Sequence, residues 1–191
     1  MTKFLTSALV ALSMTATAAM AQDWTLDTDT SRMAFGSVKN GYVGEVHTFE
    51  GLTGSVSRDG DVSIEIPLAG VSTNIDIRNE RFAEFVFTNA PTATLTAALD
   101  MAVLKKMRAG DSKTMELDAT LEFLGEEVDV FTEVFVVRTS ARDVMVTTND
   151  MVMLATDELG IDASIDKLQE LASLDSITRV TPVTVRFMFS R

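Results

Sequence analysis

Apolar and polar residues alternate with a period of two along most of this chain, and this alternation limits its possible folds more than any other feature. Residues 61–68 (DVSIEIPL) are the clearest example, with Val62, Ile64, Ile66 and Leu68 on one face. Residues 113–124 and 128–138 alternate in the same way. Successive side chains of a strand point to opposite faces of a sheet, so each segment predicts a strand with one buried face. We therefore expect an antiparallel, all-β protein.

Short turn signals separate the alternating segments, and no pattern indicates parallel strands joined by helices. The chain holds about eight predicted strands with hairpin connections. Eight antiparallel strands can close into a barrel whose interior is filled by side chains or holds one small ligand. Gly51 and Gly54 interrupt a strand-like segment, which favours the bends that curve a sheet into a barrel. A two-sheet sandwich is the alternative architecture.

Two segments interrupt the alternation. In Val71–Pro91, a group of polar residues precedes three phenylalanines. We expect a helical or loop segment near 72–90, because this stretch is longer than a hairpin connection needs. We expect it to lie over, or inside, the mouth of the barrel. The second lies near 162–174, where apolar residues recur at helical spacing behind Asp162, a candidate N-cap. This short helix is expected to seal a flank or an end of the sheet, or alternatively to gate the mouth.

The first 21 residues have the features of a secretory signal peptide. Lys3 precedes an apolar run without charge, and Ala19-Met20-Ala21 is an A-x-A cleavage site. We predict a signal peptide at 1–21 and a mature domain at 22–191, with an uncleaved anchor as the alternative. No later segment is long and apolar enough to span a bilayer. The mature chain is expected to be soluble, with at most transient membrane contact.

The composition argues against several kinds of chemistry. A net charge of −12 disfavours nucleic acid and anionic surfaces as partners. The chain has no cysteine, which removes disulfides, thiolate catalysis and cysteine metal sites. His47 is its only histidine, and no nucleophile motif or metal-ligand spacing accompanies it. We expect no catalysis, no metal and no cofactor.

Several motifs resemble the YceI-like family. Gly44–Gly51 (GEVHTFEG) is similar to the family pattern G-x-F-x-x-F-x-G, with valine at the first aromatic position. Ser72–Arg81 (STNIDIRNER) resembles the stretch S-x-x-T-x-x-x-x-R-[DN], and Pro91–Thr94 (PTAT) resembles the strand start P-x-A-T-[FL]. Asp157–Ile161 (DELGI) is similar to the element D-F-G-[IL]. Together these motifs extend over essentially the whole mature chain.

The resemblance implies a lipocalin-like, periplasmic protein that binds a polyisoprenoid. Its ligand would be an isoprenoid lipid, of polyprenyl or quinone type, or another long-chain amphiphile held in a hydrophobic tunnel. The candidates for contact with the head group are Asn74, Arg78 and Arg81. The candidates for contact with the chain are Phe35, Phe49, Phe82, Phe85 and Leu117. The link from Arg81 to Pro91 is shorter than is usual in the family, which implies a trimmed lid.

Three alternatives stay open at this stage. Arg78 and Arg81 could pair with Asp76 and Glu80 at the surface instead of contacting a ligand. The barrel could be filled by side chains, in which case the protein would be an export-compartment stress or interaction protein without a stored ligand. The sequence does not fix the oligomeric state, and a homodimer is one option.

Overall fold

The computed structural model describes residues 23–88 and 90–191, so the predicted signal peptide lies outside the described residues. The strands are β1 (Trp24–Leu26), β2 (Arg32–Lys39), β3 (Val43–Phe49), β4 (Thr53–Val56), β5 (Asp61–Pro67), β6 (Val71–Ser72), β7 (Thr92–Ala98), β8 (Ser112–Phe123), β9 (Glu126–Arg138), β10 (Asp143–Thr148), β11 (Val152–Ala155) and β12 (Val180–Ser190). The helices are α1 (Asp76–Phe85), α2 (Met101–Leu104), α3 (Asp162–Leu171) and a 3-10 turn at Leu68–Gly70. None of the helices in the described part is long and apolar enough to cross a membrane.

Eight of the strands form a closed antiparallel ring. Neighbours in the ring follow the order β1-β4-β5-β7-β8-β9-β10-β12. The ring closes because β1 also pairs with β12, with Leu26 opposite Phe189. Closure pairs the backbone groups that an open sheet would expose at its edges. The predicted eight-stranded, lipocalin-like barrel is confirmed, and the sandwich alternative is wrong.

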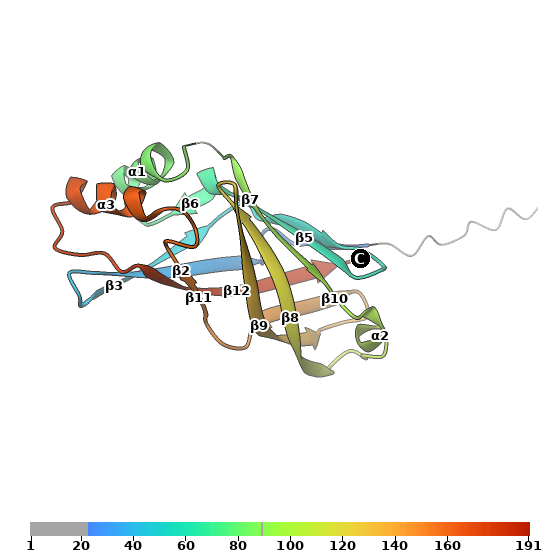
Figure 1. Cartoon of the computed structure of the whole chain (residues 1–191). Coiled ribbons are helices and arrows are strands. Elements are labelled where there is room, and N and C mark those ends of the chain that lie inside the picture. Colours follow the sequence, from blue (N-terminus) through green and yellow to red (C-terminus); the bar gives the residue numbers. More distant parts are fainter. Residues whose placement is uncertain (1–22, 89) are drawn as a thin grey trace, which may run out of the picture.

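The remaining strands extend one end of this ring. β12 pairs with β10 and β1 toward its C-terminal end, and with β11 and β2 toward its N-terminal end. β2 pairs with β3, and β3 pairs with β6. α1 and α3 contact each other over the extended end, and α2 lies at the other end (Figure 1). The strand total exceeds the predicted number because strands as short as β6 and β11 hold too few residues to show an alternation.

The predicted alternation decides which side chains fill the barrel. In β9 the buried valines are Val128, Val130, Val134 and Val136. Phe131, on the opposite face of the same strand, is 74% exposed. The buried side chains of the ring and of α3 form one hydrophobic cluster. Each fully buried side chain of this kind stabilises the fold by about 1.5–3 kcal/mol, so the one-sided pattern supplies the main driving force for closure.

The two longer helices are held in different ways. α3 buries Ile165 and Leu168 against the core. α1 buries none of its side chains fully. A polar anchor fixes its first turns instead, because the Thr73 backbone N–H and hydroxyl donate to Asn79 Oδ1 at 2.9 and 2.6 Å. Since its apolar side chains are only partly buried, α1 is the helix that needs less free energy to detach.

The N-cap predicted for the second helix is wrong. The N-cap residue of α3 is Ile161, and Asp162 is the first residue of the helix itself. The Asp162 carboxylate accepts a hydrogen bond from the Thr156 hydroxyl. A negative charge in the first turn also complements the helix dipole. Asp162 therefore supports this helix end from a position one residue later than expected.

The two glycines predicted to bend the sheet act differently. Gly51 lies between β3 and β4 with a φ of +73°, a conformation that side chains with a Cβ rarely adopt, so it does mark a bend. Gly54 lies inside β4, where an added Cβ would come within 2.6 Å of the Ser63 carbonyl oxygen and of Ile64 Cδ1. It is needed for the close approach of β4 to β5.

Replacing Gly54 by alanine is therefore expected to destabilise the barrel by about 1–3 kcal/mol, the usual cost of overpacking. The measurement is the free energy of unfolding from urea denaturation. Gly44→Ala is the matched control, because a Cβ at Gly44 in β3 meets no atom within 4 Å. That control should be neutral or slightly stabilising. Equal effects of the two substitutions would contradict the close-approach explanation.

Candidate functional site

Two adjoining cavities lie inside the molecule. The larger has a volume of about 350 Å³ and is bounded by side chains of β2, β3, β12, α1 and α3. The smaller, of about 130 Å³, lies within the ring and is lined almost entirely by apolar side chains. Five side chains line both cavities: Met33, Ile66, Leu121, Leu154 and Val183. The cavities therefore meet at this apolar boundary, along a line from the helix-covered end into the barrel.

The structure brings most of the predicted site residues to these cavities. Phe35, Phe49, Arg78, Arg81 and Phe82 line the larger cavity. Leu117 lines the smaller one.

Asn74 and Phe85 line neither cavity. Asn74 is exposed in the turn before α1, with a φ of +60°. The side chain of Phe85, the last residue of α1, is half-buried and packs against the core. The Asn74 and Phe85 predictions rested on residue type alone, without the phase of the helix.

An aromatic wall covers one side of the larger cavity. The Phe35 ring lies 5.2 Å from the Phe49 ring and 6.3 Å from the Phe82 ring, measured between centroids. Phe87 stacks on Phe82 at 5.6 Å, because the chain turns back after α1 and the Phe87 N–H donates to the Phe82 carbonyl. The sequence analysis did not select Phe87, although its position among three clustered phenylalanines was a usable signal. Phe123, the last residue of the ring strand β8, continues the wall through its contact with Phe87.

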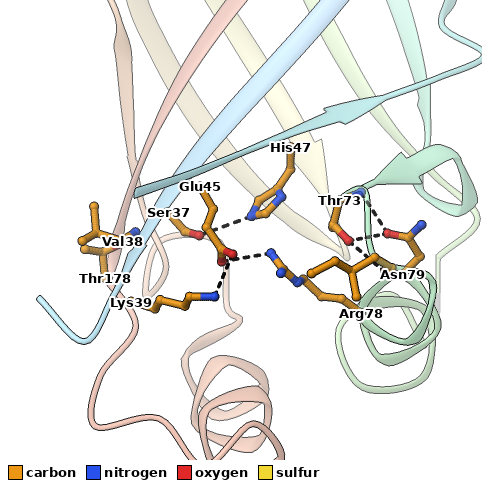
Figure 2. Close-up of polar contacts among 10 residues, drawn as sticks. Ser37, Val38, Lys39, Glu45, His47, Thr73, Arg78, Asn79 and Thr178 are labelled. Carbon is orange, nitrogen blue, oxygen red and sulfur yellow. Dashed lines mark hydrogen bonds and ion pairs between the residues drawn. The ribbon is translucent and has the colours of Figure 1, made fainter. Parts of the chain in front are cut away.

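A three-residue ion network ties α1 to the hairpin formed by β2 and β3. Glu45 on β3 pairs with Lys39 on β2 at 2.8 Å and with Arg78 on α1 at 2.9 Å (Figure 2). All three side chains line the larger cavity and are between 20% and 29% exposed. The predicted alternative, in which Arg78 pairs with Asp76 or Glu80, is wrong. Arg81 forms no ion pair within the described residues.

The ion network fixes the charge state of Glu45. Burial by itself raises the pKa of the Glu45 carboxyl, but the hydrogen bond from Lys39 and the charges of Arg78 and Lys39 outweigh it. The pKa is therefore held below its ordinary value. Because the folded-state pKa is lowered, the stabilisation by this network is complete above the unfolded-state pKa and is lost as the pH falls through the folded-state value.

His47 is the most buried titratable residue of the cavity wall. It is 3% exposed, lies with its ring 5.1 Å from Phe35, and contacts the Ser37 hydroxyl through Nε2 at 3.3 Å. Its other ring nitrogen, Nδ1, is buried and has no hydrogen-bond partner among residues 23–88 and 90–191. No carboxylate therefore orients this Ser-His pair as a catalytic triad requires. No motif around His47 in the chain predicts a role for it.

Burial is the main cause of the shift in the pKa of His47. It lowers the pKa of His47 below the ordinary value, and the Arg78 charge adds to this effect. The Glu45 carboxylate opposes the shift, while Lys39 reinforces it. The imidazole is consequently neutral near pH 7, and the two ring nitrogens supply one donor and one acceptor.

A family model with the description YceI-like domain matches residues 24–172. The chain belongs to the YceI-like family. The structure is similar to that of a polyisoprenoid-binding domain from Saccharophagus degradans, at 31% sequence identity and a TM-score of 0.85. That comparison covers 87% of this chain and 97% of the other.

A second solved structure supports the fold alone. BcnA from Burkholderia cenocepacia has a TM-score of 0.66 at 13% identity, over 85% of this chain and 98% of that one. No curated protein matches the chain. The YceI-like resemblance predicted from the motifs is thus confirmed by the family model and by the fold.

Removing the charge of Glu45 should loosen α1. In Glu45→Gln, Arg78 keeps its position without its partner, so the helix loses an anchor and its amides are expected to exchange with deuterium several-fold faster. The measurement is hydrogen exchange of α1 peptides by mass spectrometry at pH 7. Glu80→Gln is the control, because Glu80 lies on the same helix and is exposed. Unchanged exchange in Glu45→Gln would contradict an anchoring role.

The lowered pKa of His47 should make stability depend on pH. The unfolded chain binds a proton near pH 6.5 more readily than the folded chain does, so the free energy of unfolding is expected to fall as the pH drops below 6.5. The slope cannot exceed about 1.4 kcal/mol per pH unit for one proton. Urea denaturation between pH 7.5 and about 5.5 measures it, since carboxylates titrate mainly below that range. In His47→Gln this part of the slope should vanish.

Proposed function

We propose that this protein binds an isoprenoid lipid, of polyprenyl or quinone type, and carries or sequesters it in the periplasm. The observation that carries the proposal is the pair of adjoining apolar cavities, closed by an aromatic wall and ending at a polar mouth under α1. Such a site suits an amphiphile with a long apolar chain and a small polar head. The relative from Saccharophagus degradans, described as polyisoprenoid-binding, supports the same ligand class.

Chain burial is sufficient to give useful affinity. At ~0.8 kcal/mol per buried CH₂, one five-carbon isoprene unit contributes roughly 4 kcal/mol before ordering costs. Micromolar affinity corresponds to about 8 kcal/mol, so a few buried units exceed it even after part is lost to immobilisation. Polar groups at the mouth are then not required for strength, and their role is to orient the ligand.

The proposal gives a role to most of the predicted site residues and omits the others. Phe35, Phe49 and Phe82 contact the first part of the chain, and Leu117 contacts its far end in the ring. Arg78 and Arg81 lie at the head-group end. Asn74 and Phe85 are omitted, because the structure places them outside both cavities.

The periplasmic part of the proposal is supported by the signal peptide predicted at 1–21 and by the family resemblance. A cavity of about 350 Å³ at the helix-covered end supports ligand binding over the alternative of a filled barrel without a ligand.

The first experiment is native mass spectrometry of residues 22–191, purified from the periplasm without detergent. It is followed by organic extraction and identification of any released lipid. A bound polyprenol or isoprenoid quinone is the expected result. A ligand-free mass that stays unchanged after incubation with ubiquinone and with a polyprenol would overturn the proposal.

A charged residue in the aromatic wall should abolish this binding. Phe82→Glu places a carboxylate beside the apolar chain, where it lacks a counter-charge, and lipid affinity is expected to fall at least tenfold. The measurement is titration with a short-chain isoprenoid by calorimetry. Phe131→Glu is the matched control, because Phe131 lies on the outer face of the barrel and is 74% exposed. Equal loss in both variants would show that the effect is not specific to the cavity.

A further inference from the structure

We propose that the polar end of the larger cavity binds an anionic head group, a phosphate or a carboxylate, through His47 Nδ1 and the Arg81 guanidinium. This inference rests on the proposed lipid-binding function and specifies the chemistry of the ligand's head. It is carried by two independent observations, an unpartnered buried nitrogen in the cavity wall and an excess of positive charge around it.

His47 supplies the first observation. The residue lines the cavity at 3% exposure, and Nδ1 has no hydrogen-bond partner within the described residues. A buried polar atom without a partner is costly, so such atoms are rare in folded proteins and call for an explanation. In Figure 2 this second nitrogen lies on the side of the ring that faces Thr73 and Arg78, away from Ser37. We assign the missing partner to a ligand atom, which reaches Nδ1 once the ring or a neighbouring group shifts, because Nδ1 itself is buried.

The charge of the cavity wall supplies the second observation. Three cationic side chains line the larger cavity, Lys39, Arg78 and Arg81, against one anionic side chain, Glu45. The whole chain has a net charge of −12, so this wall is opposite in sign to the rest of the protein. Glu45 satisfies Lys39 and Arg78 jointly, which leaves the network with one positive charge and Arg81 with another. A bound anion would complete this arrangement.

The helical spacing brings the charge and the apolar wall together. Arg78, Arg81 and Phe82 are related by three and four residues on α1, so they share one face of the helix. All three line the larger cavity. The His47 ring lies 6.3 Å from the Phe82 ring, which places the unpartnered nitrogen at the border between polar and aromatic surfaces. That border is where the head of an amphiphile joins its chain.

The tautomer of His47 suits an acceptor in the ligand. If the Ser37 hydroxyl donates to Nε2, the proton of the neutral ring resides on Nδ1, which can then donate to an anionic oxygen. Hydrogen bonds to charged acceptors are about twice as strong as those between neutral groups. The groups that set the ring's electrostatics are Arg78 on α1, Glu45 on β3 and Lys39 on β2. An anion beside the ring would raise the pKa of His47 from its lowered value.

Calorimetric titration of the protein with three probes of matched chain length separates head-group preference from chain burial. The probes are farnesol, farnesoic acid and farnesyl phosphate, each below its micelle concentration. Both anions should bind at least tenfold more tightly than farnesol at low salt, and the difference should shrink as salt is added. The ratio of the affinities for farnesoic acid and farnesyl phosphate shows whether a carboxylate or a phosphate is the preferred head group. Inorganic phosphate is the fourth probe, and it should compete only weakly because it has no chain.

Two variants test the assigned cation. Arg81→Gln should weaken binding of the anionic probes about tenfold and leave farnesol within about twofold. Arg108→Gln removes the same charge from an exposed position just after α2, the helix at the opposite end of the ring. This control should change the affinity for neither the anionic probes nor farnesol. Loss of anion affinity in both variants would mean that only the net charge matters and would overturn the assignment to Arg81.

NMR of the imidazole nitrogens tests the assigned histidine. His47 is the only histidine, so in protein purified without a histidine tag its ¹⁵N signals need no assignment. Farnesyl phosphate should move the Nδ1 signal and raise the apparent pKa of His47, while farnesol should raise it little. An unchanged Nδ1 signal at saturation would overturn the role of His47.

The outcomes separate this inference from the function on which it rests. Equal affinity for farnesol and both anions would overturn the anionic head group while leaving lipid binding intact. Absence of binding by every farnesyl probe, by ubiquinone and by a polyprenol would overturn lipid binding itself.

Discussion

The rest of the structure depends on the pairings of β12. This strand pairs along both of its edges, in its N-terminal half and in its C-terminal half. One half of β12 closes the ring against β1, and the other half continues past the ring to hold β2 and β11. β1 and β2 pair with the same edge of β12, one after the other. The sheet must therefore widen at the point along β12 where β1 ends and β2 begins. That widening leaves room for the larger cavity, which α1 and α3 then cover.

The two covering helices contribute unequally to the cavity. α3 is fixed by buried apolar residues and belongs to the core. α1 is fixed by Asn79, by the pairing of Arg78 with Glu45 and by the partly buried rings of Phe82 and Phe85, none of which is fully shielded from water. Exposed or half-exposed ion pairs contribute little stability, so α1 can open at a smaller cost than any strand of the ring. Under the proposed function, opening of α1 would give a long-chain ligand a route into the larger cavity.

The sequence predicted the barrel because alternation is a local signal that each strand carries by itself. The family resemblance predicted Phe35, Phe49 and Phe82, and all three line the larger cavity. Alternation could not have selected Phe82, because this residue lies on α1. The sequence did not predict the partner of Arg78, because Glu45 lies on another strand and only the fold brings them together. His47 was missed on similar grounds. Its importance comes from burial and an unpartnered nitrogen, neither of which a single sequence displays.

The proposed site for an anion is positively charged, whereas the protein as a whole is acidic. The electrostatic effects of the site and of the whole protein act over different distances. The charge of −12 acts over the whole surface and repels an approaching anion, whereas Arg81 and His47 act only within the cavity. Salt at physiological strength screens interactions beyond about 8 Å, so it weakens the long-range repulsion more than the short contacts. Added salt should therefore speed the arrival of an anionic ligand even as it weakens the bound state. Selectivity would then reside in dissociation, as is usual when closely related ligands differ in affinity.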